Sequence, residues 1–418
     1  MNATATYLDQ STERSNYRHL VMDIAWFGLA LATTSRFLSV YAIQLNASAM
    51  ELAWITALPS LVMMFSSSLA VWWRRRFTNT IQAMFWPSLG FRLSFLLLVF
   101  TPYLPVELQP WWLIVSVTLP AVPQGIGSVL FLVMMREAVQ SERLASLVSR
   151  RSTAMNVTVA ISAVACGFWL ENVAFPLNYQ IIFFLGFVAT LVSLWHVQRV
   201  RLQSQIIPPP APTERRTNSW RYPGAWKSAA MTMITHVVYF AILPLTPLYL
   251  VDEMGASEGF MAMFGLMELA AGAIMALFTG QMVRTIGNRS TAAIGMVGTA
   301  ASVVFIAFAP ALWMTLISAI VLGASWTAAG IGVFGYVNEQ ARGEGAGPAH
   351  MTVHLQTFAL AAFVGPLVAS QLVEWGVDLV AVLLLGAASR LVVGAMIVLP
   401  WHRVKDARAA QFITRALF

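Results

Sequence analysis

The sequence is poor in charged residues and in cysteine. Only 10% of its 418 residues are charged, against roughly a quarter in an ordinary soluble domain. Its single cysteine, Cys166, excludes an intrachain disulfide and a multi-cysteine metal site. No phosphate-binding glycine loop, metal-ligand cluster or catalytic triad is evident, so we expect no cofactor, no metal and no enzyme activity.

The sequence is instead rich in long apolar stretches, since 58% of its residues are hydrophobic. A helix needs roughly 20 apolar residues to cross a bilayer, and backbone groups in lipid must be hydrogen-bonded internally. We therefore predict an all-α membrane protein with twelve transmembrane helices. The predicted spans cover residues 20–44, 50–73, 81–103, 111–135, 153–174, 178–197, 228–251, 258–282, 291–309, 311–337, 351–373 and 378–401.

The basic residues are sorted between the two sides of these spans. Of the 25 lysines and arginines, 22 lie in the two tails and in five alternate connections, and the other six connections carry none. Basic residues near helix ends are retained in the cytoplasm. The pattern predicts a multi-pass protein of the plasma (inner) membrane with both termini cytoplasmic. The net charge of +7 then reflects topology in the lipid bilayer and not a nucleic-acid partner.

One connection divides the chain. It is basic and contains the proline-rich run from Pro208 to Pro212, which predicts an exposed linker. The two sides also resemble each other weakly, which suggests duplication and two pseudo-symmetric six-helix bundles. The predicted parts are an N-terminal tail (1–19), a first bundle (20–197), the linker (198–227), a second bundle (228–401) and a C-terminal tail (402–418).

This organisation resembles the major facilitator superfamily, whose members have twelve spans, a six-plus-six division and a long basic middle loop. The superfamily has a signature in the loop between the second and third spans, often echoed in the second half. The echo here runs from Gly280 to Arg289 and keeps Gly287, but Arg284 stands at its acidic position. The first-half loop keeps a basic cluster around Arg75. We assign these residues to a gating loop.

The fourth span carries a second part of the resemblance. Antiporters of the superfamily have Arg-x-x-Gln-Gly-x-Gly there, and this chain keeps Gln124, Gly125 and Gly127 but has Ala121 in place of the arginine. The resemblance implies a monomeric transporter of a small-molecule substrate that works by alternating access. Because that arginine is the residue usually linked to proton handling, antiport remains a hypothesis.

The resemblance implies that the first, fourth, seventh and tenth spans line a central cavity, so polar and aromatic residues on them are candidates for substrate binding. Arg36 is the first candidate, because an intramembrane arginine can contact an anionic or polar group. The alternative is an arginine that reaches the interface or joins two helices. The other candidates are Trp26, Gln124, Tyr239 and Trp326, for which simple helix packing is the alternative.

Three titratable residues are candidates for proton coupling. Glu268 lies near the middle of the eighth span, where a carboxyl group suits reversible protonation. His236 lies mid-span in the seventh helix and could share a proton with Glu268. Asp23 lies one turn inside the first span. The alternatives are a neutralised carboxyl for Glu268, a packing residue for His236 and an interfacial acid for Asp23.

The sequence thus favours a secondary active transporter of a small organic solute, with proton-coupled efflux as one form. An organic-anion transporter is an alternative, because Arg36, Arg92 and Arg390 lie within apolar stretches. Two further alternatives are a uniporter and a transporter-like scaffold or sensor that no longer transports.

Overall fold

The computed structural model describes residues 9–35, 37–202, 219–341 and 346–398, and every regular element in them is helical. Within these residues ten helices are long and apolar enough to cross a membrane. One of them, α12 (Glu258–Ala307), is 50 residues long and contains Gly287, whose backbone is not helical (φ 81°, ψ 165°). The predicted all-helical membrane fold is therefore confirmed, and the number of twelve spans stays a prediction.

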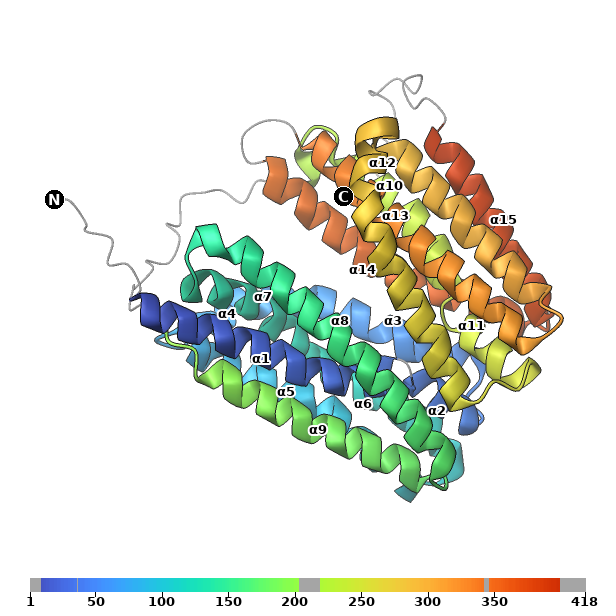
Figure 1. Cartoon of the computed structure of the whole chain (residues 1–418), viewed down its shortest axis with the longest axis horizontal. Coiled ribbons are helices and arrows are strands. Elements are labelled where there is room, and N and C mark those ends of the chain that lie inside the picture. The colour runs from blue at the N-terminus through green and yellow to red at the C-terminus, as the bar shows by residue number, and fades with distance from the viewer. Residues whose placement is uncertain (1–8, 36, 203–218, 342–345, 399–418) are drawn as a thin grey trace. The chain divides into compact units, whose positions relative to one another are not determined.

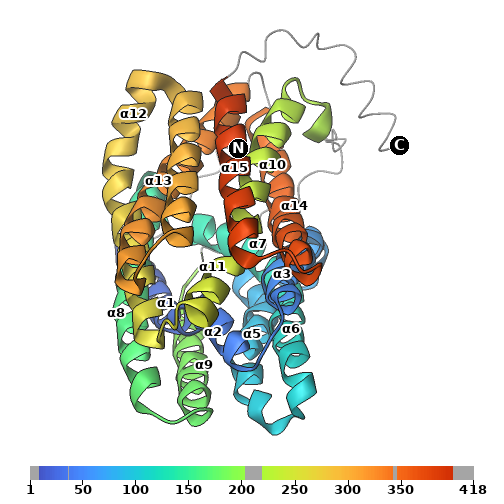
Figure 2. The same ribbon diagram turned by 90° about the vertical axis from the view of Figure 1, so that its right-hand side faces the viewer.

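The helices follow one another with short connections (Figures 1 and 2). The first nine are α1 (Gln10–Ser35), α2 (Leu38–Gln44), α3 (Ala49–Ser66), α4 (Ala70–Arg74), α5 (Thr80–Val99), α6 (Gln109–Thr118), α7 (Ala121–Ala138), α8 (Ser141–Asn172) and α9 (Leu177–Gln198). After the linker come α10 (Ala225–Ala241), α11 (Leu245–Leu248), α12, α13 (Thr315–Gln340), α14 (Ala346–Glu374) and α15 (Leu379–Val398).

Contacts divide the described chain into two compact units. The first unit holds the residues before 203 together with 244–269, and the second holds 219–243 and the residues from 270 onward. In the first unit α1 packs against both α8 and α9, and these three helices lie side by side in Figure 1. In the second unit α10 packs along α14 and also contacts α15, as Figure 2 shows. The predicted six-plus-six boundaries stay a prediction.

Two of the predicted spans are interrupted next to proline. Residues 111–135 form α6 and α7, which are separated at Leu119 and Pro120. Residues 228–251 form α10 and α11, which are separated before Pro244, and a short π turn follows. Proline lacks an N–H and its ring clashes with the preceding turn, so it interrupts the hydrogen-bond ladder of a helix. A third predicted span, 20–44, is also divided, into α1 and α2.

Arg390 of α15 joins three helices of the second unit. Its guanidinium donates to the carbonyls of Val238 and Tyr239 in the last turn of α10, and to the carbonyl of Thr299 in α12. Carbonyls in the last turn of a helix have no partner within it, and cations are favoured there. Arg390 is 2% exposed. A charge so deep in the bundle is tolerated because three backbone oxygens accept from it, two of them in the last turn of α10.

Glycines allow α12 and α13 to approach closely. A Cβ atom at Gly332 would lie 2.6 Å from the amide nitrogen of Ala292 and 2.7 Å from the carbonyl oxygen of Asn288. A Cβ at Gly298 on the opposite helix would lie 2.0 Å from the hydroxyl of Ser325. Small residues at a helix crossing let the backbones come together in a membrane bundle.

This crossing gives a stability prediction. Gly332→Ala should lower the stability of the second unit by roughly 1–3 kcal/mol, because backbone atoms must move to admit the methyl group. Gly330→Ala is the matched control, since nothing lies within 4 Å of a Cβ there. It should be neutral or stabilising by up to about 1 kcal/mol, since alanine is the better helix former. Thermal unfolding in detergent measures both, and equal melting temperatures for the two variants would contradict the crossing.

Candidate functional site

A cavity lined by both charged and apolar side chains lies inside the first unit. Its volume is about 210 Å³. Side chains from α1, α5, α7, α8 and α9 line it: Asp23, Ile24, Phe27, Ser88, Phe91, Arg92, Gln124, Gly127, Ser128, Phe131, Arg151, Ser193 and Val197. The cavity thus combines three charged groups and several polar groups with three phenylalanine rings.

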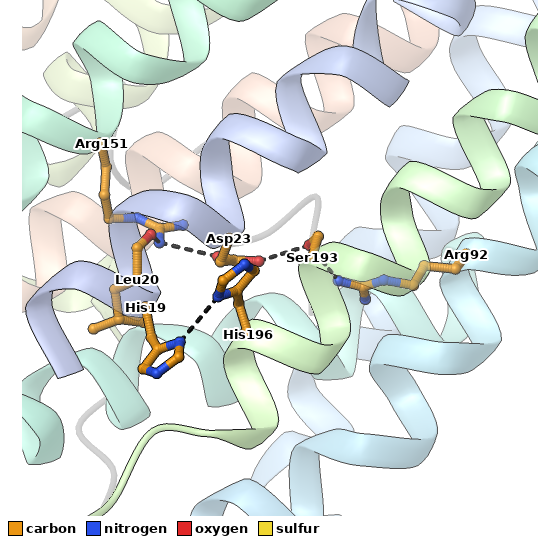
Figure 3. Close-up of polar contacts among 7 residues, drawn as sticks. All are labelled: His19, Leu20, Asp23, Arg92, Arg151, Ser193 and His196. Carbon is orange, nitrogen blue, oxygen red and sulfur yellow. Dashed lines mark hydrogen bonds and ion pairs between the residues drawn. The ribbon is translucent and has the colours of Figure 1, made fainter. Parts of the chain in front are cut away.

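Asp23 of α1 is the centre of the charged group (Figure 3). Its Oδ2 accepts from Nη1 of Arg151 on α8 at 3.0 Å, and its Oδ1 accepts from the hydroxyl of Ser193 on α9 at 2.6 Å. Arg151 also donates to the carbonyl of Leu20, one turn earlier on α1. Asp23 is 4% exposed and Arg151 is 8% exposed. Both oxygens of the carboxylate are therefore engaged, which a buried carboxylate requires.

Arg92 of α5 extends this network on the other side. Its Nη2 donates to the hydroxyl of Ser193 at 2.9 Å, so Ser193 connects Arg92 to Asp23. Its Nε and Nη1 donate to the carbonyls of Thr190 and Ser88, each at 2.7 Å. In Figure 3 the chain of bonds runs from Arg151 on α8 to Arg92 on α5. One ionic network thus joins four helices.

A glycine explains why Asp23 and Arg151 can meet. Gly28 lies just over one turn after Asp23, and a Cβ there would lie 2.1 Å from the hydroxyl of Thr158 and 3.1 Å from the carbonyl of Met155. The backbones of α1 and α8 therefore touch at this level. The close crossing brings the carboxylate within hydrogen-bond distance of the guanidinium.

Two histidines lie beside this network. The Nδ1 atoms of His19 on α1 and His196 on α9 are 2.9 Å apart, so one ring must donate and the other must accept (Figure 3). His19 precedes the predicted first span. Partial burial, together with the nearby Arg199 and Arg18, lowers the pKa of His19 below its usual value.

The second unit has a different kind of cluster. Ser228 and Thr232 of α10 each share a hydrogen bond of 2.8 Å with a histidine of α14, His350 and His354 respectively. One turn further along α10, the Nδ1–H of His236 donates to the carbonyl of Thr232 at 2.8 Å. Hydroxyl groups and imidazoles therefore alternate along the packed faces of α10 and α14.

Aromatic rings surround His236. Tyr239 and Trp326 are stacked with their ring centroids 3.4 Å apart, and the His236 ring meets Trp326 edge-on at 5.3 Å and Phe358 at 4.9 Å. Tyr239 also lies beneath the guanidinium of Arg390 at 5.2 Å. Two of the predicted substrate-binding residues, Tyr239 and Trp326, are thus in contact with each other.

The structure brings some of the other predicted site residues together and separates the rest. Asp23 and Gln124 share the wall of the cavity, whereas its lining does not include Trp26, which is 38% exposed. Arg36 lies outside the described residues. Glu268 is half-buried on α12 in the first unit, and His236 belongs to the second. A proton shared by Glu268 and His236 stays a prediction.

The predicted gating loop of the second unit contains both free and engaged residues. Gly287 has φ 81° and breaks α12, which suits a residue without a side chain. Arg289 donates twice to the carbonyl of Ile397 near the end of α15, where a cation is favoured. Arg284 is exposed, and open space surrounds Gly280. In the first unit Arg75 is exposed.

Sequence reasoning missed the role of Arg151 and Ser193 in the cavity. Arg151 was counted among the sorted basic residues that indicate topology, because it stands just before an apolar stretch. Ser193 is one of many serines in apolar stretches and carries no signal of its own. No cluster of three metal-ligating side chains occurs in the part of the chain that the structure describes.

Comparison with known proteins identifies the family. A sequence profile described as "Major Facilitator Superfamily" matches residues 24–366, which is well over half of the chain. The chain belongs to the major facilitator superfamily. Membership confirms the resemblance seen in the sequence and makes the chain a multi-pass membrane protein with a transporter fold. No curated protein sequence matches it significantly.

Several solved superfamily structures share the fold. A D-xylose-proton symporter superposes with a TM-score of 0.70 at 13% identity, over 94% of this chain and 98% of that one. An auto-inhibited POT family peptide transporter gives 0.70 at 12% identity, with coverage of 94% and 98%. The nucleoside transporter NupG gives 0.68 at 11% identity, with coverage of 93% and 98%. At these identities the likeness establishes the fold.

The histidine pair of this superfamily member gives a pH prediction. The unfolded chain protonates His19 near its ordinary pKa of about 6.5, and the folded chain does so only at lower pH. The folded state is therefore destabilised as the pH falls below about 6.5, where the unfolded chain binds the proton first. Between about pH 8 and about pH 5, the wild type should lose on the order of 2 °C more in melting temperature than His19→Asn. An identical loss in both proteins would show that the protonation of His19 does not change with folding.

Proposed function

We propose that this protein is a secondary active transporter that moves a small organic solute across the plasma membrane by alternating access, coupled to protons through Asp23. Both termini lie in the cytoplasm in this proposal, as the sorted basic residues indicate. Two pseudo-symmetric bundles would rock against each other during the transport cycle.

The buried carboxylate of Asp23 on the wall of the cavity carries this proposal. Ionisable groups inside a membrane bundle are costly and usually mark a substrate or proton pathway. Asp23 has the features that a coupling residue needs. It is buried, it lines the cavity, and it is paired with Arg151, which would lose this partner if the carboxylate took up a proton.

The other two candidates have weaker support. Glu268 is half-buried and does not line the cavity. His236 is buried among aromatic rings, and its Nδ1–H donates to a backbone carbonyl, which fits a packing role. We therefore place Asp23 ahead of both as the proton carrier.

The structural neighbours support the class of solute. Their names describe transporters of a sugar, nucleosides and peptides, all small polar organic molecules, and the sugar transporter is named as a proton symporter. The breaks in the helices at Pro120 and Pro244 support alternating access, because a discontinuous helix can change its angle without unfolding.

Transport by purified protein in liposomes tests the coupling. A solute would first be identified by the thermal stabilisation that binding causes. Asp23→Asn keeps the size of the side chain and removes the titrating proton. It should reduce accumulation driven by a pH gradient by at least about tenfold. Exchange of labelled for unlabelled solute without a gradient should persist.

The matched control is Glu13→Gln. Glu13 is on the same helix, 1% exposed, and paired with Arg143 at 3.5 Å, but it does not line the cavity. The control should retain gradient-driven accumulation. Accumulation retained in Asp23→Asn but lost in Glu268→Gln would move the coupling to Glu268. If the wild type transports the solute at the same rate with and without a pH gradient, the protein is a uniporter. If it transports none of the solutes that stabilise it, the protein is a scaffold or sensor.

A further inference from the structure

The charges of the cavity in the first unit do not balance. Two guanidinium groups, Arg92 and Arg151, line it with one carboxylate, Asp23. Arg92 is 4% exposed, so all three groups are more than nine-tenths buried. The cavity therefore has a formal charge of +1 within an apolar bundle. A buried net charge is strongly unfavourable, and it attracts a counter-ion of opposite sign.

The hydrogen bonds show how these three charged groups are already partnered. Asp23 already uses Oδ1 for Ser193 and Oδ2 for Arg151. The three hydrogen bonds of Arg92 in the described structure go to neutral oxygens, those of Ser88, Thr190 and Ser193. Asp23 is the only carboxylate among the lining residues, and its ion pair is with Arg151. Arg92 is connected to Asp23 only through the hydroxyl of Ser193.

Protonation of Asp23 would change this arrangement. A neutral carboxyl group no longer neutralises Arg151, so the cavity charge would rise from +1 to +2. Entry of one monoanion would restore it to +1, the value of the empty cavity. Entry of a neutral solute with the proton would leave the second positive charge buried. When Asp23 is protonated, an anionic solute therefore leaves less buried charge than a neutral solute does.

We propose that the solute is a small organic monocarboxylate that replaces Asp23 as the partner of Arg151 when Asp23 takes up a proton, so that one anion and one proton move together. This inference rests on the proposed coupling through Asp23. It makes the transporter a symporter whose solute and proton carry no net charge between them.

The rest of the wall indicates the body of the solute. Phe27, Phe91 and Phe131 supply apolar surface, while Gln124 and Ser128 supply hydrogen bonds. The guanidinium carbon of Arg151 lies 4.6 Å from the centroid of Phe131, and that of Arg92 lies 5.3 Å from the centroid of Phe91. Both cations are thus placed against aromatic rings, beside which a flat apolar group can lie. An aromatic or short aliphatic acid fits this combination.

Few charged or titratable side chains face Asp23 in the described structure. They are Arg151 on α8, Arg92 on α5, the His196 ring on α9 and its partner His19 on α1 itself, while α7 contributes the uncharged Gln124 and Ser128. The two histidines can also take up protons, so a variant that removes only the Asp23 charge must be compared with one that leaves it in place.

Binding of benzoate and hexanoate to the purified full-length protein tests the inference, with benzamide and hexanamide as neutral analogues of the same shape. At least one acid should raise the melting temperature, and neither amide should. Uptake of one proton with each anion makes the apparent affinity rise by about tenfold for each unit by which the pH falls. His19→Asn should keep this slope.

Two variants decide the role of each charge. Asp23→Asn should bind the acid with an affinity that no longer depends on pH and that exceeds the wild-type affinity at about pH 8, because the competing carboxylate is gone. Arg151→Gln should bind at least about tenfold more weakly. If Arg151→Gln alone does not fold, Asp23→Asn/Arg151→Gln removes both members of the ion pair and should also fail to bind.

The charge balance gives a separate test in liposomes. An imposed membrane potential acts on the net charge that a cycle moves. Proton-coupled transport of the acid should therefore be unaffected by a potassium gradient with valinomycin. Three outcomes would each overturn the inference. The amides could stabilise the protein as strongly as the acids, neither acid could stabilise it, or the membrane potential could drive transport. Even if the carboxylate inference fails, loss of pH-driven transport in Asp23→Asn would still support proton coupling through Asp23. The failure of the inference can therefore be told apart from the failure of the proposed function.

Discussion

The structure of the first unit depends on how a carboxylate and two guanidiniums are kept inside an apolar bundle. Unpaired charges in such surroundings would be too costly, so each must be held by partners from other helices. Asp23 meets this requirement with Arg151 and Ser193, and Ser193 accepts in turn from Arg92. The network fixes α1, α5, α8 and α9 relative to one another and, by the same bonds, forms the polar wall of the cavity.

The second unit satisfies its buried polar groups in another way. Arg390 donates to backbone carbonyls at the broken end of α10, and the histidines of α14 pair with hydroxyl groups of α10. The described residues around these groups include stacked aromatic rings in place of a carboxylate. In the described residues the buried ionic network thus belongs to the first unit, and the stacked aromatic cluster belongs to the second.

Particular residues show how far sequence reasoning reached. Asp23 and Gln124 could be proposed because a polar residue in an apolar stretch is conspicuous, and both line the cavity. Arg92 also stands out as an arginine in an apolar stretch, and in the structure it both bridges α5 and α9 and faces the cavity. Arg151 could not be recognised, because an arginine at the start of a span looks the same whether it marks topology or turns inward. Only the close crossing at Gly28 gives it a buried partner.

The sequence by itself determined that this is an all-helical membrane protein of the major facilitator superfamily, because apolar length and the spacing of signature residues are properties of the chain. Tertiary structure decided which charges meet. The contact between Asp23 and Arg151 joins residues 128 positions apart in the sequence, and it depends on a helix crossing that local patterns do not encode. Since the character of the cavity depends on the charges that packing brings together, the case for a carboxylate that pairs with Arg151 could only come from the folded chain.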